Sequence, residues 1–148
     1  MKKILLIFIF LLSECGYQPV YLNKNLGNIE FNKISLEGNA DINRKIIDSI
    51  SFKENKLNDK LNNLLIKSSY KITETSKNSK GQIESYKSQI SLNLIIKDGK
   101  KVISSKNFFK EFSYNNKNNK FELVRYQNEV KDNLIYKIIE DIILYLSI

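Results

Sequence analysis

The chain has 148 residues, a length typical of one domain, and carries 24 Lys and Arg against 16 Asp and Glu. It contains no histidine and one cysteine, and neither a GxGxxG nor a GxxxxGK[ST] phosphate loop occurs. These absences remove the commonest general base and metal ligand, intramolecular disulfides and Cys₄ zinc sites. The composition therefore predicts a protein that is not an enzyme, with no catalytic residues, no metal site and no cofactor.

The first segment, residues 1–14, has the pattern of a signal peptide. Met1-Lys2-Lys3 is positively charged, and residues 4–12 form an unbroken apolar stretch. Nine residues make a helix of about 14 Å, which is far shorter than the ~30 Å hydrocarbon layer of a bilayer. The stretch is therefore predicted to be a signal-peptide core rather than a transmembrane helix.

The only cysteine, Cys15, follows this stretch directly in a lipobox-like context. In a bacterial lipoprotein the thiol at this place takes a diacylglyceryl group, and cleavage then makes the cysteine the acylated N-terminus. Leu12 and Ser13 fit that pattern, whereas Glu14 stands where a small residue is usual. We expect Cys15 to be the lipid anchor and residues 15–28 to be a lipidated tether. An uncleaved membrane-tethered N-terminus and a secreted protein with a free thiol are the alternatives.

The next residues predict a strand followed by a helix. Residues 29–36 alternate between apolar and polar side chains, with a change of phase near the end. Asp41 can cap a helix whose apolar positions recur at helical spacing and which frays near residues 52–58. These apolar positions are Ile42, Ile46, Ile47 and Ile50.

Three strands are predicted next, over residues 64–75, 83–97 and 102–114. The second is the clearest, because apolar and polar side chains alternate along its length. Asp98-Gly99 signals a hairpin. A loop of three residues, 98–100, or a bulge would pair Ile90 with Phe108 and keep every apolar side chain on one face, since a slip of one residue inverts the faces.

Residues 121–146 predict one long helix, with apolar side chains recurring every four residues from Val130 to Leu146. This stripe is expected to pack on the sheet rather than on a membrane surface. The predicted fold is therefore α+β in the order β-α-β-β-β-α. A mainly antiparallel four-stranded sheet has both helices on one face, and residues 29–148 form one domain.

The residues at the predicted mature N-terminus read Cys15-Gly16-Tyr17-Gln18-Pro19-Val20-Tyr21. This segment resembles the start of the LPS-assembly lipoprotein family LptE, which typically reads Cys-Gly-aromatic-x-Pro-Leu/Val-Tyr. The resemblance is specific over the tether, and the β-α-β-β-β-α order matches the family in general terms.

The resemblance implies a non-enzymatic lipoprotein on the periplasmic face of the outer membrane. Such a protein plugs the lumen of the LptD β-barrel, and the two together insert lipopolysaccharide into the outer leaflet. The implied partners are an LptD-type barrel, lipopolysaccharide, and the membrane through N-terminal acyl chains. Gly16, rather than Asp, after the cysteine fits outer-membrane sorting.

Lys97, Lys100 and Lys101 at the predicted hairpin tip are candidate contacts for lipopolysaccharide phosphates, because lysine binds phosphate as a point charge. The alternative is an ordinary solvated turn. The aromatic residues of the last strand are expected to serve core and barrel-facing packing rather than a ligand pocket; they are Phe108, Phe109, Phe112 and Tyr114.

Three other functions compete with this interpretation. One is a different periplasmic lipoprotein that acts as a binding or scaffold module. A nucleic-acid-binding module would suit the basic, aromatic sheet, but export removes that partner, so no nucleic acid is expected. A serine hydrolase is disfavoured because the chain has neither GxSxG nor histidine.

Overall fold

A computed structural model describes residues 29–147 of the chain. The predicted signal peptide and the candidate lipid anchor Cys15 lie outside these residues. Six strands and two helices follow one another along the described chain. They are β1 (Ile29–Phe31), β2 (Ile34–Gly38), α2 (Ala40–Ile50), β3 (Phe52–Glu54), β4 (Asn63–Lys77), β5 (Ile83–Asp98), β6 (Lys101–Asn115) and α3 (Lys120–Leu146).

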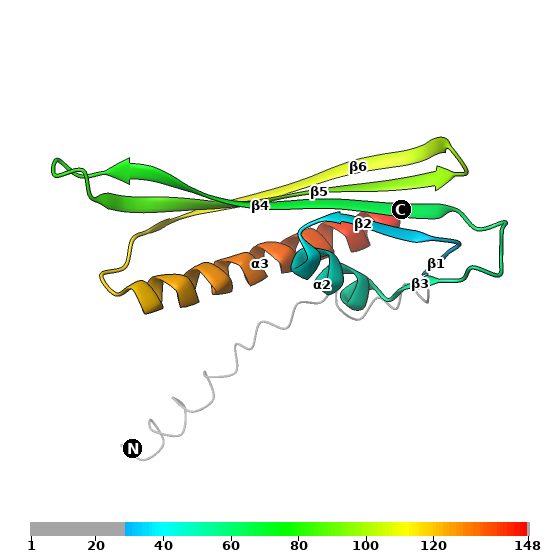
Figure 1. The fold of residues 1–148 in the computed structure, drawn as a ribbon, viewed down its shortest axis with the longest axis horizontal. Helices are drawn as coiled ribbons and strands as arrows, with labels where there is room; N and C mark the ends of the chain where they lie inside the picture. The colour runs from blue at the N-terminus through cyan, green and yellow to red at the C-terminus, as the bar shows by residue number, and fades with distance from the viewer. Residues whose placement is uncertain (1–28, 148) are drawn as a thin grey trace, which may run out of the picture.

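The main sheet has four strands in the order β2-β4-β5-β6, and both helices lie on one of its faces (Figure 1). Strands β4, β5 and β6 are antiparallel neighbours, whereas β2 runs parallel to β4. The predicted α+β class and the two helices on one face are confirmed. The sheet is mixed because the crossover through α2 brings the chain back to the sheet in the same direction.

A second, small sheet joins β1 and β3 in parallel, and the sequence did not predict it. The strand expected over residues 29–36 is divided in two, and residues 52–54 form a strand rather than a fraying helix end. Ser51 stops α2 with a left-handed backbone, φ 59°. Phe31 and Phe52 then pack edge to face with ring centroids 5.5 Å apart, which ties the two short strands together.

Helix α2 begins two positions earlier than predicted, because its cap is Asn39 rather than Asp41. The Asn39 side chain accepts a hydrogen bond from the backbone N–H of Ile42 at 3.1 Å. Asp41 lies within the first turn, where its carboxylate pairs with Lys131 of α3. Both residue types cap helices well, so the local sequence did not distinguish the two starting points.

The three-residue loop predicted at 98–100 is wrong. Asp98 pairs with Lys101, so that Gly99 and one further residue form a two-residue turn. Gly99 has a left-handed backbone, φ 54°, and turns of this length match the twist of antiparallel strands.

The alternative prediction, a bulge, is confirmed one step further along the hairpin. The register shifts beyond Ile96, where Ile103 is the extra residue on β6. Leu92 therefore opposes Phe108, two residues away from the predicted partner Ile90. A shift of two residues keeps the side chains of β6 beyond the bulge on their predicted face, whereas Val102, which lies before the bulge and opposes Lys97 instead of Ile96, is on the opposite face.

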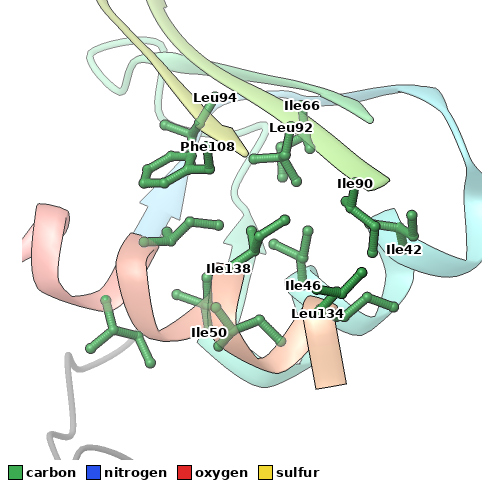
Figure 2. Close-up of a cluster of buried hydrophobic side chains, with 14 of the residues drawn as sticks. Ile42, Ile46, Ile50, Ile66, Ile90, Leu92, Leu94, Phe108, Leu134 and Ile138 are labelled. Atoms are coloured by element: carbon green, nitrogen blue, oxygen red, sulfur yellow. The ribbon is translucent and has the colours of Figure 1, made fainter. Parts of the chain in front are cut away.

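The core lies between the helices and the sheet (Figure 2). Side chains from α2, α3 and the three long strands meet there with at most 5% of their surface exposed. The labelled members are Ile42, Ile46, Ile50, Ile66, Ile90, Leu92, Leu94, Phe108, Leu134 and Ile138. The predicted apolar faces of both helices and of β5 are thus confirmed. None of the helices in the described residues is both long enough and apolar enough to cross a bilayer.

In the described part of the chain, no helix covers the opposite face of the sheet (Figure 1). Cross-strand neighbours on this open face are mostly polar, as in the rows Lys67–Asn93–Asn107 and Lys71–Gln89–Glu111. Strand β6 forms one edge of the sheet, and within residues 29–147 no strand pairs with its outer side.

Candidate functional site

The predicted site lysines lie where the β5–β6 hairpin turns. Lys97 opposes Val102 and is partly exposed, while Lys100 and Lys101 are exposed in and after the turn. Within residues 29–147, none of the three ammonium groups has a carboxylate within 4.0 Å. Asp98 sits between them in sequence and lowers their combined charge.

The long loop between β3 and β4, residues 55–62, lies at the same end of the sheet (Figure 1). The register explains this, because Asn63 at the start of β4 pairs with Lys97 near the end of β5. The loop adds Lys56 and Lys60, both exposed. We use the name basic end for the surface formed by Lys56, Lys60, Lys97, Lys100 and Lys101. The carboxylates of Asp59 and Asp98 lie among these lysines.

Hydrogen bonds hold this loop against the beginning of the described chain. The backbone N–H of Asn32 donates to the carbonyl of Asn62 at 2.9 Å, and its side-chain amide lies 3.3 Å from both the carbonyl of Asn58 and a carboxylate oxygen of Asp59. Asn32 directly follows β1, so the described chain starts at the basic end.

Exposed apolar side chains accompany the lysines. Leu57 is 97% exposed, and Val102 and Ile103 are 52% and 53% exposed. The predicted loop of three residues would have placed Val102 on the core face, opposite Ile96, and no predicted feature singled out Leu57. The run Asn55-Lys56-Leu57-Asn58, with one apolar residue among polar ones, was a signal that could have identified it.

The aromatic residues of β6 divide between two roles. Phe108 and Tyr114 are buried, at 5% and 6% exposure, as the core prediction requires. Phe109 is exposed on the open face of the sheet, and Phe112 lines a groove of 540 Å³ between β6 and α3. The groove is also lined by Tyr126, Val130, Glu129, Asn133, Lys137 and Glu140. It mixes aromatic, apolar and charged side chains.

A pair of ionic contacts joins the two helices away from the basic end. Lys45 of α2 lies 2.6 Å from Asp132 of α3, and Lys131 lies 2.5 Å from Asp41. The hydrogen bond to Asp132 raises the pKa of Lys45, and the hydrogen bond from Lys131 lowers the pKa of Asp41. These contacts fix α2 on α3.

A buried hydroxyl cluster lies under the sheet. The hydroxyl of Ser88 is 3.2 Å from that of Tyr70 and 3.1 Å from that of Tyr114. Burial raises the pKa of Tyr70, and the hydroxyl groups of the cluster can satisfy one another as hydrogen-bond donors and acceptors. No carboxylate or amine joins the cluster within residues 29–147, so it has no base to activate the serine. Across the same residues, no group of three or more His, Cys, Asp or Glu could hold a metal ion.

Comparison with known proteins adds information about the fold. No known protein-family model and no curated protein sequence matches the chain. Several solved structures do match. The rare lipoprotein B from Shewanella oneidensis aligns with a TM-score of 0.54 at 15% identity, over 76% of this chain and 91% of that one.

Two further structures match at a TM-score of 0.50 and 10% identity. The uncharacterized lipoprotein B from Nitrosomonas europaea aligns over 81% of this chain and 84% of its own. A homolog of neuraminyllactose-binding hemagglutinin from Helicobacter pylori aligns over 78% and 83%. The architecture is therefore one that bacterial lipoproteins adopt. At such low identity the likeness concerns the fold alone, since one fold serves many functions.

Proposed function

We propose that the chain is a non-enzymatic lipoprotein of the outer membrane that plugs an LptD-type β-barrel and helps to insert lipopolysaccharide into the outer leaflet. Acyl chains on Cys15 would anchor it to the periplasmic face. The support for the anchor is the position of the only cysteine directly after an apolar signal segment, in the run Cys15–Tyr21 that resembles the LptE family. Two of the matching structures carry the name lipoprotein, which agrees with this proposal.

The observation that carries the plug role is the open, mostly polar face of the sheet. Large membrane barrels have a wet, polar interior, and a body that fills one must offer polar groups on the surfaces that meet its wall. Strand β5 has 16 residues, so the open face extends over about 50 Å. Helices α2 and α3 brace the other face with a continuous core and keep the sheet rigid.

Lipopolysaccharide contact is assigned to Lys97, Lys100 and Lys101. These residues lie in the hairpin at one extremity of the sheet (Figure 1), and Lys100 and Lys101 are exposed there, so phosphates can reach them without deforming the core. Each ammonium presents a point charge with three donors to a phosphate oxygen. A triple Lys→Gln variant at these positions should weaken binding of lipopolysaccharide. The matched variant Lys77→Gln, Lys80→Gln, Lys120→Gln removes the same charge elsewhere and should not.

The proposal is tested by purifying the full chain from outer membranes through a C-terminal tag. We expect a β-barrel of much greater mass to co-purify, and depletion of the chain to leave that barrel unassembled. Intact-mass measurement should give a chain that starts at Cys15 and carries a diacylglyceryl group and an N-acyl chain. A bare thiol and the absence of any barrel companion would refute the proposal.

The second candidate is a periplasmic lipoprotein that acts as a binding or scaffold module, and the groove beside Phe112 favours it. The groove combines aromatic side chains with Lys137 and Glu140, as small-molecule sites often do. Phe112→Ala should leave barrel assembly intact under the first proposal. Lipidation without any barrel partner, together with a small molecule that co-purifies only when Phe112 is present, would favour the second.

A further inference from the structure

The basic end carries apolar side chains for which the plug role has no use. Leu57 is 97% exposed, and the lysines Lys56 and Lys60 flank it in the same loop. Val102 is half exposed at the start of β6, at the same end of the sheet. Lys56 also lies 3.5 Å from the carboxylate of Glu54, and its side chain is largely exposed. An exposed apolar side chain flanked by two lysines suits a peripheral membrane contact, in which the apolar group enters the interface and the ammonium groups meet anionic headgroups.

The chain before the described residues also joins the domain at this end. Residue 29 begins β1, and Asn32 is hydrogen-bonded to the loop that carries Leu57. Fourteen residues separate Cys15 from Ile29, a reach of at most about 50 Å. The long strands are about 50 Å as well, so the opposite end would meet a membrane only at the limit of that reach.

The opposite end of the sheet also carries lysines and an exposed apolar side chain. These are Lys77 and Lys80, together with Phe121, which is 88% exposed. The place where the N-terminal segment joins the domain therefore decides which end can meet the membrane more readily. Contact of the opposite end with the membrane would require the whole span that the residues between Cys15 and Ile29 can reach, whereas contact of the basic end requires only a small part of it. The effective concentration of membrane is therefore much higher at Leu57 than at Phe121.

We propose that the basic end docks on the surface of the anchoring bilayer, with Leu57 in the interface and Lys56 and Lys60 on the headgroups of anionic phospholipids. This inference rests on the membrane anchor of the proposed function and concerns the anchored chain while it is outside a barrel. In that state the long strands stand away from the membrane surface, and the hairpin with Lys97, Lys100 and Lys101 lies close to it (Figure 1).

The chain contains no tryptophan, so a single introduced indole reports its own environment. We would compare the variants Leu57→Trp and Phe121→Trp in the full chain, reconstituted on phosphatidylcholine vesicles with and without phosphatidylglycerol. With phosphatidylglycerol present, the emission of the Leu57→Trp chain should shift to the blue and be quenched by brominated lipid. The indole of the Phe121→Trp chain should remain in water. Equal quenching in both variants, or no quenching in the Leu57→Trp chain, would overturn the proposal.

The dependence of docking on positive charge is tested with two matched double variants. Each lysine near an anionic surface contributes about fivefold in affinity, so Lys56→Gln with Lys60→Gln should weaken docking of the Leu57→Trp chain roughly 25-fold. Lys77→Gln with Lys80→Gln removes the same charge at the opposite end and should leave docking unchanged. If both pairs weaken docking equally, the effect is one of net charge and the proposed surface is wrong.

A third set of vesicles replaces phosphatidylglycerol with lipid A as the anionic lipid. Quenching of the Leu57→Trp chain on lipid A alone would assign this surface to lipopolysaccharide and refute the phospholipid assignment. Quenching with phosphatidylglycerol supports it. Co-purification of a barrel is measured separately and does not depend on Leu57, so a failure of the docking proposal remains distinguishable from a failure of the proposed function.

Discussion

Gly38 joins β2 to α2 at a point where no side chain fits, and Gly38→Ala tests this reasoning. The residue has a left-handed backbone, φ 89°, and pairs with Ser68 of β4. A Cβ atom added there would lie 1.8 Å from the carbonyl oxygen of Ser68, and real Cβ contacts are essentially never shorter than 3.0 Å. The backbone must therefore move by more than an ångström.

The expected cost has two parts. A left-handed backbone costs a residue with a Cβ about 1–2 kcal/mol. The displacement also weakens the hydrogen bond from the N–H of Asn39 to Ser68, 3.2 Å long, and the bond from Ser68 to the buried Asn43. Each contributes about 1 kcal/mol. Gly38→Ala should therefore lower the free energy of unfolding by at least about 3 kcal/mol.

Two glycines serve as controls because they share the positive φ but not the contact. Gly81 and Gly99 have φ of 76° and 54°, and an added Cβ meets no atom within 4 Å at either place. Their alanine variants should cost only this backbone penalty, about 1–2 kcal/mol. Denaturant unfolding followed by far-UV circular dichroism gives all three values. A midpoint for Gly38→Ala equal to that of Gly99→Ala would refute the steric argument.

Two further predictions concern the core and the contact between the helices. Ile138 is fully buried, so Ile138→Ala should lower the free energy of unfolding by about 3–4 kcal/mol. Ile103 is half exposed, so the control Ile103→Ala should change the free energy of unfolding by less than about 1 kcal/mol. Equal losses in the two variants would contradict the assigned core. The pKa of Lys45 is raised in the folded chain, so the stability that this ammonium group contributes is complete below its ordinary pKa of 10.5 and is lost as the pH rises through the higher folded pKa. Lys45→Met should therefore weaken the dependence of thermal stability on alkaline pH. The pKa of Asp41 is lowered in the folded chain, so the stability that this carboxylate contributes is present above pH 3.8 and is lost as the pH falls through the lower folded pKa; Asp41→Asn should therefore weaken the dependence of thermal stability on acid pH. Each of these two effects is about 0.5 kcal/mol, because the ion pairs are partly exposed. An unchanged pH profile in either variant would argue against these contacts.

The parts of the fold that the sequence predicted are those with a long periodic signal. The four-residue repeat of α3 and the alternation along β5 each extend over more than a dozen residues, so one or two residues that break the pattern do not change the predicted type of element. The same alternation required either a longer loop or a bulge in the hairpin. The structure contains the bulge at Ile103 because a two-residue turn alone would have turned the apolar side chains of β6 outward.

The parts that could not be predicted depend on contacts between distant residues. Strands β1 and β3 have three residues each, which is too short for a period, and they exist because Phe31 and Phe52 meet. The start of α2 at Asn39 depends on the close approach of Gly38 to β4.

The candidate site likewise combines features that a local sequence pattern predicted with features that depend on contacts between distant residues. Lys97, Lys100 and Lys101 could be placed on a turn from the sequence, and the assignment of phosphate binding to them stays a prediction. Their proximity to Leu57 required the register of β4 and β5, in which Asn63 opposes Lys97. Cys15 lies outside the described residues, and its role as lipid anchor remains a prediction from the sequence.

The outer edge of β6 affects how the isolated protein behaves in solution. The strand has fifteen residues, and every second one offers its backbone N–H and C=O groups to any extended chain, including a second copy of the protein. Lys101 and Lys106 lie along this strand, and their like charges oppose the approach of another such edge. Salt screens that repulsion, so concentrated samples should stay monodisperse at low ionic strength and begin to aggregate as the ionic strength rises.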